Sequence, residues 1–275
     1  MRPVERIADA DDPRVAAYLG IRERDLIGHG GRFIAEGEIV LGALVGSRFA
    51  IESVFLLDTR LPRLAPLLEA LPHAVPVYTA PRAIMDQVVG FPIHRGVLAV
   101  GQRGADTSPA ELLAGLGPRA LVVGLVGLAN HDNVGGVFRN AAAFAADAVL
   151  LDGTTCDPLY RKAIRVSAGA GLLVPFARAS SAGALVEALD AAGYESVALS
   201  PSGGETLREI AFGDRTALLV GAEGRGLPAD VLTRARSVRV PMAPGCDSLN
   251  VATASGIALY EARQTGSRFP RIRAE

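Results

Sequence analysis

The second half of the chain alternates short apolar runs with segments whose apolar residues recur at helical spacing. The runs at 120–128 and 216–223 predict buried strands, and the segments 134–146 and 182–193 predict amphipathic helices. Further strands are predicted in DAVLL, LLVPFAR, ESVALS and SVRVPM, and further helices in LYRKAIRVSAGA and over 249–264. Strands separated by helices predict an α/β fold whose parallel sheet is covered on both faces.

The first hundred or so residues show a second, smaller α/β pattern. Strands are predicted at 32–36 and 51–57 and in AVPVYTA and GVLAVGQR, and helices after Gly37 and in LPRLAPLLEAL. The stretch that follows is rich in Gly, Pro and small polar residues, which is typical of a linker. We therefore expect three parts: an N-terminal domain over 1–101, a linker over 102–118 and a C-terminal domain over 119–275.

The composition is that of an ordinary globular protein, because hydrophobic residues make up 49% and charged residues 21% of the 275. No apolar run is long enough to span a bilayer. The N-terminal stretch MRPVERIADADDPRV lacks the apolar core of a signal peptide. We therefore expect a cytoplasmic protein with no membrane partner.

The two cysteines, Cys156 and Cys246, and the four histidines show no metal-ligand spacing, so no metal is expected. Cys246 lies close to Ser248, where a reactive thiol is conceivable. It has no histidine in its motif, and we interpret it as a small space-filling residue.

The net charge of −1 does not indicate a nucleic-acid binder, but nearly all the positive charge is arginine, which suits phosphate. The basic residues gather in three clusters, each of which is either a phosphate-binding surface or simply a solvated face. The clusters are Arg161, Lys162 and Arg165; Arg234, Arg236 and Arg239; and Arg263, Arg268, Arg271 and Arg273.

Ligands of parallel α/β sheets bind beyond the carboxyl ends of the strands, where this chain places three unusual loops. In the first, LANHDNVGGVFRN, Asn133 is expected to cap a helix. The glycine pair 135–136 is disfavoured in a helix and would clear space for Arg139 to fold back toward the helix start. There the guanidinium could hold a phosphate or activate a hydroxyl.

The second loop, GAEGRGLP, is a glycine-rich turn around Glu223, whose carboxylate argues against a phosphate cradle. In the third, PMAPGCDSLN, Ser248 and Asn250 precede the helix predicted over 249–264. Ser248 could cap that helix, but capping does not account for Asn250. The helix is apolar on most faces, which indicates a buried helix or a subunit interface.

Together, the segments NVGGVFRNAAAFAADAVLL, LLVGAEGRGLP and VPMAPGCDSLNVATASGIALYEA resemble, in that order, the three motifs of the SpoU (TrmH) RNA 2′-O-ribose methyltransferases of the SPOUT superfamily. The match covers about residues 118–265. The N-terminal segments FIAEGEIVLGAL, IESVFLL and HRGVLAV are similar to the ribosomal-protein-like, RNA substrate-binding domain of many members.

The resemblance implies a C-terminal SPOUT domain with a deep trefoil knot, a homodimer, S-adenosylmethionine as methyl donor and an RNA substrate, ribosomal RNA before transfer RNA. It implies donor binding, largely through backbone groups, at Ser200, Gly221, Val240, Met242 and Leu249. The catalytic positions that match the motifs are Asn133, Arg139, Glu223, Ser248 and Asn250.

Methyl transfer to a 2′-hydroxyl gains mainly from proximity and from stabilising the developing alkoxide. Arginine resists deprotonation, so Arg139 is better suited to stabilising charge and positioning phosphate than to acting as a base. Two alternatives remain. One is a Rossmann-type oxidoreductase, with Asp152 as the ribose-binding acid, although Gly124 and Gly127 do not complete a dinucleotide motif. The other is a non-catalytic RNA-binding member of the family.

Overall fold

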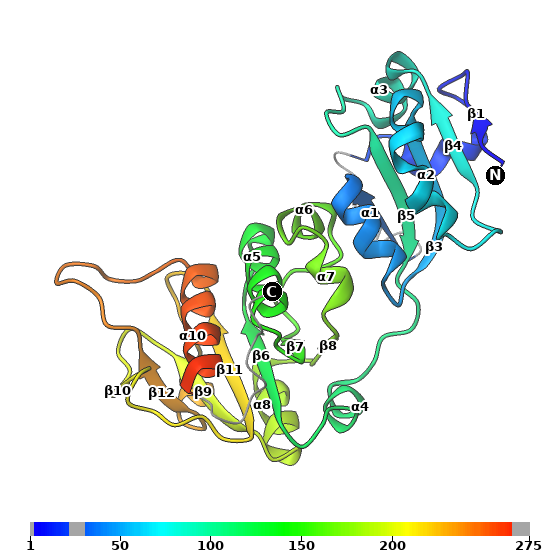
Figure 1. Cartoon of the computed structure of the whole chain (residues 1–275). Coiled ribbons are helices and arrows are strands. Elements are labelled where there is room, and N and C mark those ends of the chain that lie inside the picture. Colours follow the sequence, from blue (N-terminus) through cyan, green and yellow to red (C-terminus); the bar gives the residue numbers. More distant parts are fainter. Residues whose placement is uncertain (1–2, 22–30, 266–275) are drawn as a thin grey trace. The chain divides into compact units, whose positions relative to one another are not determined.

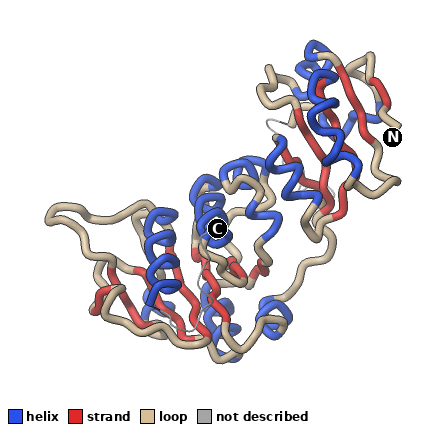
Figure 2. The backbone as a smooth tube through the Cα atoms, viewed as in Figure 1, coloured by secondary structure: helices blue, strands red, loops and turns tan. Residues whose placement is uncertain are grey.

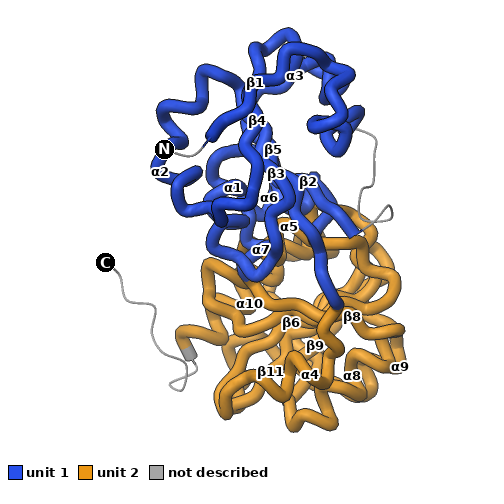
Figure 3. Tube along the Cα trace, turned by 90° about the vertical axis from the view of Figure 1, so that its right-hand side faces the viewer, with its two compact units in different colours: residues 1–105, 159–173 blue, residues 106–158, 174–275 orange. Residues whose placement is uncertain are grey.

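The computed structural model describes residues 3–21 and 31–265, and these form two compact units (Figure 3). Unit 1 comprises residues 1–105 and 159–173, and unit 2 comprises 106–158 and 174–275. Each unit has its own sheet and core. In the part of the chain that is described, no helix is long and apolar enough to cross a membrane.

Unit 1 is built on a mixed five-stranded sheet in the order β1-β4-β3-β5-β2. Figure 2 draws the strands of both units in red and the helices in blue. Only the pairings of β5 with β2 and β3 are antiparallel. The strands are β1 (Glu5–Arg6), β2 (Arg32–Glu36), β3 (Ala50–Leu57), β4 (Val77–Ala80) and β5 (Val97–Gln102). The helices are η1 (Pro13–Tyr18), α1 (Glu38–Val45), η2 (Asp58–Arg60), α2 (Leu61–Glu69), α3 (Arg82–Val89), α6 (Arg161–Val166) and α7 (Ala170–Leu173).

The single helix predicted in LYRKAIRVSAGA is two helices, α6 and α7, because the backbone turns left-handed between them. Ala168 has φ of 52° and Gly169 has φ of 88°. A side chain at Gly169 would place its Cβ 2.6 Å from the Ala43 Cβ, so the absence of a side chain also lets α1 pack closely here.

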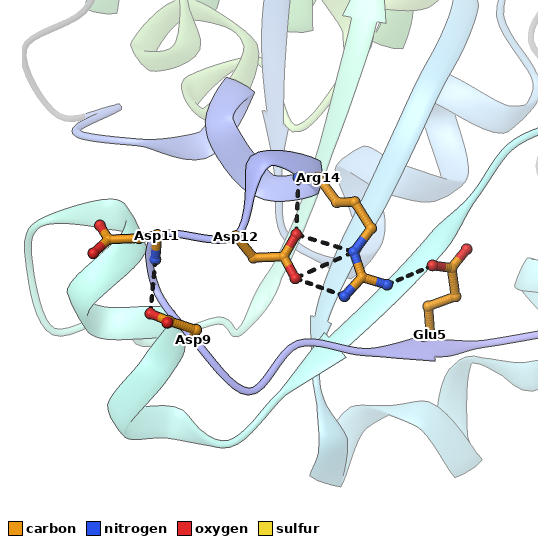
Figure 4. Close-up of polar contacts among 5 residues, drawn as sticks. All are labelled: Glu5, Asp9, Asp11, Asp12 and Arg14. Carbon is orange, nitrogen blue, oxygen red and sulfur yellow. Dashed lines mark hydrogen bonds and ion pairs between the residues drawn. The ribbon is translucent and has the colours of Figure 1, made fainter.

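An ion-pair clamp joins β1 to η1 at the start of unit 1 (Figure 4). The guanidinium of Arg14 donates to both Asp12 carboxylate oxygens and to Glu5 Oε2. Asp12 also accepts from the Arg14 backbone N–H and so caps η1. The hydrogen bonds from Arg14 lower the pKa of Asp12 from 3.8 to about 2.

Unit 2 is built on a seven-stranded sheet in the order β10-β12-β9-β11-β6-β7-β8, and every pairing in it is parallel, as predicted (Figure 1). The strands are β6 (Ala120–Val126), β7 (Ala148–Leu151), β8 (Phe176–Arg178), β9 (Glu195–Leu199), β10 (Glu205–Thr206), β11 (Arg215–Gly221) and β12 (Arg236–Arg239). The helices are α4 (Pro109–Ala114), α5 (His131–Ala143), α8 (Ala182–Ala191), α9 (Ala229–Leu232) and α10 (Val251–Thr265).

Helices cover both faces of this sheet. Leu185 and Leu189 of α8 and Val231 of α9 pack with the face that carries Val122 and Leu219. On the other side, α10 contacts β11, α5 contacts β7, and the two helices lie side by side. Because side chains alternate across a strand, the buried central residues of β6 and β11 contact the helix layers on both faces.

Candidate active site

A cavity of about 720 Å³ opens at the carboxyl ends of three adjacent parallel strands in unit 2. Its walls are the segments that follow β9, β11 and β12, together with the first turn of α10. All five positions predicted to hold a methyl donor line it: Ser200, Gly221, Val240, Met242 and Leu249. Glu223, Ser248 and Asn250 line the same cavity.

The glycine-rich turn after β11 is tight enough to exclude side chains at its base. A Cβ at Gly221 would lie 2.3 Å from the carbonyl carbon of Gly226. The Gly226 N–H donates to Ala222 O, and both Gly224 and Gly226 have positive φ. These glycines therefore let the backbone double back on itself and present Glu223 at the cavity.

The carboxamide of Asn250 joins three segments that are far apart in the sequence. Its Nδ2 donates to Asn133 Oδ1 at 2.9 Å and to Glu223 Oε1 at 3.0 Å. Its Oδ1 accepts from the backbone N–H groups of Ala252 and Thr253, which makes Asn250 the cap of α10. One side chain therefore starts the last helix and ties it to the two other loops.

The prediction that Asn133 caps its helix was wrong, and the capping role left open for Ser248 is filled by Asn250. Helix α5 begins at His131, and its cap is Asn130, whose Oδ1 accepts from Asp132 N–H. Asn133 is instead buried in the first turn, where it accepts the hydrogen bond from Asn250. Ser248 is exposed and does not cap α10, because Asn250 does.

Arg139 lies on α5 with its side chain exposed. The structural role of the glycine pair before Arg139 differs from the expected one. A Cβ at Gly136 would lie 2.7 Å from the Ala252 Cβ, so Gly136 makes room for α10 rather than for the arginine. Among the described residues no hydrogen bond or ion pair engages the Arg139 guanidinium, which leaves it available to a ligand.

A second asparagine on α5, Asn140, joins α5 to α10. Its Nδ2 donates to Ala252 O at 2.6 Å and to Ser255 Oγ at 3.2 Å. It lies seven residues after Asn133 and therefore on the same face of the helix. That i, i+7 spacing of asparagines is the signal that could have revealed the face that docks on α10.

Most of the described arginines in the predicted clusters form ion pairs or hydrogen bonds with other residues of the chain. The Arg161 Nη1 lies 2.6 Å from Glu36 Oε2. Arg234 pairs with Asp190 and Glu187 of α8, and Arg236 pairs with Glu205 and Glu195. These side chains are therefore not simply a solvated basic face.

Arg263, of the third cluster, donates to the carbonyl oxygens of Phe144 and Ala145 at the C-terminal end of α5. Its neighbours in that cluster, Arg268, Arg271 and Arg273, lie outside the described residues.

Cys246 is exposed, so its interpretation as a space-filler was wrong. Its Sγ lies 3.7 Å from Ser248 O. Burial, by contrast, raises the pKa of the Cys156 thiol to about 11. Within residues 3–21 and 31–265, no three His, Cys, Asp or Glu side chains are grouped so that they could hold a metal.

Asp152, the acid required by the oxidoreductase alternative, is buried and occupied. Its carboxylate accepts from Gly127 N–H, from the Thr154 hydroxyl and from the N–H and hydroxyl of Thr155. Burial alone would raise the pKa of Asp152, but these hydrogen bonds outweigh it and lower the pKa. Asp152 therefore joins the segments that follow β6 and β7. The oxidoreductase interpretation is left without its ribose-binding acid.

The sequence model of the SpoU rRNA methylase family matches residues 120–260. The uncharacterized tRNA/rRNA methyltransferase of Mycobacterium bovis is 40% identical over 274 residues, which covers 96% of this chain and 93% of that protein.

Among solved structures, the AdoMet-bound rRNA methyltransferase of Sinorhizobium meliloti has a TM-score of 0.81 at 24% identity, and the match covers 95% of this chain and 98% of that one. The SpoU methyltransferase AviRb of Streptomyces viridochromogenes, in complex with AdoMet, has a TM-score of 0.75 at 25% identity, over 90% and 95% of the two chains. The family match, the full-length relative and the shared fold agree, and the chain therefore belongs to the SpoU family of RNA methyltransferases.

Proposed function

We propose that this protein transfers a methyl group from S-adenosylmethionine to a ribose 2′-hydroxyl of RNA in the cytoplasm, with ribosomal RNA as the first candidate substrate. The observation that carries the proposal is the hydrogen-bonded set Asn133–Asn250–Glu223, of which Asn250 and Glu223 line the cavity in unit 2. It brings together one residue from each of the three loops that resemble the family's motifs.

The cavity suits the proposed donor in size and lining. Its volume, about 720 Å³, lies in the range of pockets for small molecules and cofactors. Apolar side chains such as Leu199, Val240 and Met242 alternate in the wall with backbone from the turn 221–226. The carboxylates of Glu223 and Asp247 in the lining would favour a ligand with a positive centre. Bound here, S-adenosylmethionine would supply an electrophilic methyl group.

The other residues have roles that follow from their positions. Arg139 has an exposed guanidinium, and it would bind a phosphate of the RNA and stabilise negative charge developing on the 2′-oxygen. Asn250 would hold Glu223 and Asn133 in a fixed arrangement. Ser248, exposed in the cavity wall, offers the RNA ribose a hydroxyl partner.

We also propose that unit 2 is threaded as a trefoil knot and that two copies form a homodimer. The strand order supports the knot, because the chain crosses over β9 between β11 and β12 and then returns to pack α10 against β11 and α5. The aromatic side chain of Tyr260 on α10 is half exposed, which supports a surface on this helix for the second copy of the chain. Unit 1, with its own sheet, is proposed as the domain that recognises RNA.

Transfer RNA is the second candidate substrate, since the curated relatives are described as tRNA/rRNA methyltransferases. Incubating the protein with methyl-labelled donor and with each RNA class from cells that lack the gene distinguishes the two. Alkali-resistant linkages in the labelled RNA then locate 2′-O-methyl groups. Label that is confined to bases would contradict the ribose assignment.

Arg139→Ala is expected to lower the methyl-transfer rate by about 100-fold or more, because it removes the charge that stabilises the transition state. Donor affinity, measured by calorimetry, should stay within about twofold of the wild type, since Arg139 does not line the cavity. Arg234→Ala is the matched control, because within residues 3–21 and 31–265 the ion pairs of Arg234 are to Glu187 and Asp190 of α8. Full activity of Arg139→Ala would refute the assignment.

A further inference from the structure

The turn between β9 and β10, residues 200–204, forms one wall of the cavity. Ser200, Pro201 and Ser202 line it, and the two serine hydroxyls lie 3.0 Å apart. Gly203 N–H donates to Ser200 O, which closes the turn. The turn contains two consecutive glycines, 203 and 204, so its own backbone does little to hold it in one conformation.

Strand β12 holds this turn at both ends. Ser200 N–H donates to Val238 O at the start of the turn, and Leu207 N–H donates to Arg239 O after it. Gly203 lies directly against the β12 backbone, with no room for a side chain.

The guanidinium of Arg239 holds the last two residues of the turn. Its Nη1 donates to Gly203 O at 2.5 Å and to Gly204 O at 3.0 Å. Hydrogen bonds from a charged donor are about twice as strong as neutral ones. Arg239 is half-buried and is followed directly by Val240, which lines the cavity, as does Met242. One side chain therefore fixes the wall after β9 relative to the wall after β12.

We propose that Arg239 is a positioning residue for the methyl-donor pocket: it pre-organises the 200–204 turn against β12 so that the donor meets a wall that is already formed. This inference rests on the proposed function, which assigns the cavity to S-adenosylmethionine. A turn that has to become ordered on binding lowers affinity, since part of the binding free energy is spent on ordering it. The loss should therefore appear in donor affinity, with the methyl-transfer step itself little changed.

The test compares Arg239→Met and Arg239→Lys with Arg234→Met in the full chain. Methionine keeps an unbranched side chain but has no donor, whereas lysine keeps a charged donor that can reach a carbonyl. Arg234 lies on the approach to the same strand but pairs with α8, so its replacement is the matched control. For each variant we would measure the donor dissociation constant by calorimetry, KM and kcat for the donor, and the thermal unfolding temperature.

Arg239→Met is expected to raise the donor dissociation constant and KM by about tenfold, with kcat at saturating donor within about twofold of the wild type. Arg239→Lys should recover part of the affinity, and Arg234→Met should bind as the wild type does. Unchanged donor affinity in Arg239→Met would overturn the inference, as would an equal loss in Arg234→Met. If Arg239→Met does not fold, Arg239→Lys decides by the same affinity measurement. A wild-type protein that binds no donor would overturn the proposed function instead, so the two failures are distinguishable.

Discussion

At the scale of single residues, Asn250 shows how a side chain can serve stability and site geometry through different atoms. Its oxygen caps α10, and its nitrogen reaches Asn133 and Glu223. The sequence shows that an amide precedes the helix, but it does not reveal that the nitrogen and the oxygen have different partners. Both partners of the nitrogen are more than 25 residues away. The two roles can be separated by substitution.

Asn250→Ala removes both roles, and we expect a loss of about 1 kcal/mol in the free energy of unfolding along with most of the activity. Asn250→Asp keeps the capping oxygen but sets a carboxylate against Glu223. It should unfold near the wild-type temperature and still lose activity. Thermal unfolding and a methyl-transfer assay check the pair. Ser181→Ala, which uncaps α8 on the other face, should lose stability alone. Wild-type activity in Asn250→Asp would contradict the role of the nitrogen.

The ion pair of Asp12 predicts how the stability of the protein depends on pH. Its pKa is lowered in the folded protein by hydrogen bonds from Arg14, to about 2 from 3.8, so its stabilising contribution is complete above about pH 4 and is lost as the pH falls toward 2. Asp12→Asn should therefore show a smaller loss of thermal stability between pH 4 and pH 2 than the wild type. Asp11→Asn is the control, because the Asp11 carboxylate takes no part in the clamp (Figure 4). Parallel pH profiles for wild type and Asp12→Asn would contradict the clamp.

At the scale of elements, the packing seam between α5 and α10 brings Asn133 of the first loop next to Asn250 of the third. Gly136 and Gly256 let the helices approach, and Asn140 bonds across them. Arg263 then donates to the carbonyls at the C-terminal end of α5, where positive charge is favoured. Desolvation lowers the pKa of Arg263, since the guanidinium is largely enclosed by this seam.

Gly136→Ala should destabilise the protein by about 1–3 kcal/mol, because the clash with Ala252 outweighs a gain in helix propensity of about 1 kcal/mol. Ala252→Gly in the same chain should restore part of the loss. Urea unfolding of the two single variants and the double variant measures the coupling. Gly183→Ala, in α8, has room for its Cβ and should be neutral or stabilising. Additive effects at positions 136 and 252 would show that the two residues do not compete for space.

The elements that were predicted correctly are those with a clear period. The buried strands β6 and β11 and the helix α5 stand out because their apolar runs and helical spacings are long. The two-residue strands β1 and β10 were missed, since two residues carry no period. Helix starts were displaced by two or three residues, because the capping asparagines at 130 and 250 compete with other polar neighbours. The arginine partners were invisible, since they depend on chain segments far apart in the sequence.

At the scale of the whole molecule, ion pairs within the chain reduce the number of arginines that can bind RNA phosphates. With a net charge of −1 and arginines such as Arg234 and Arg236 held by carboxylates, RNA binding should depend on a few unpaired groups. Arg139→Ala should reduce the slope of log affinity against log salt by about one, and Arg234→Ala should leave it unchanged. Fluorescence anisotropy over a salt series measures both slopes. Equal reductions would show that the paired arginines also reach the RNA.

Every residue that lines the cavity in unit 2 falls between Leu199 and Ala254. A chain emerging from the ribosome can therefore complete unit 1 and most of the parallel sheet before any pocket exists. The Asn250 carboxamide, which joins the three loops, is among the last of these groups to be synthesised. Under the proposed function, catalytic competence would therefore arise late in biosynthesis, and a nascent chain stalled before residue 250 would carry the scaffold with an incomplete pocket.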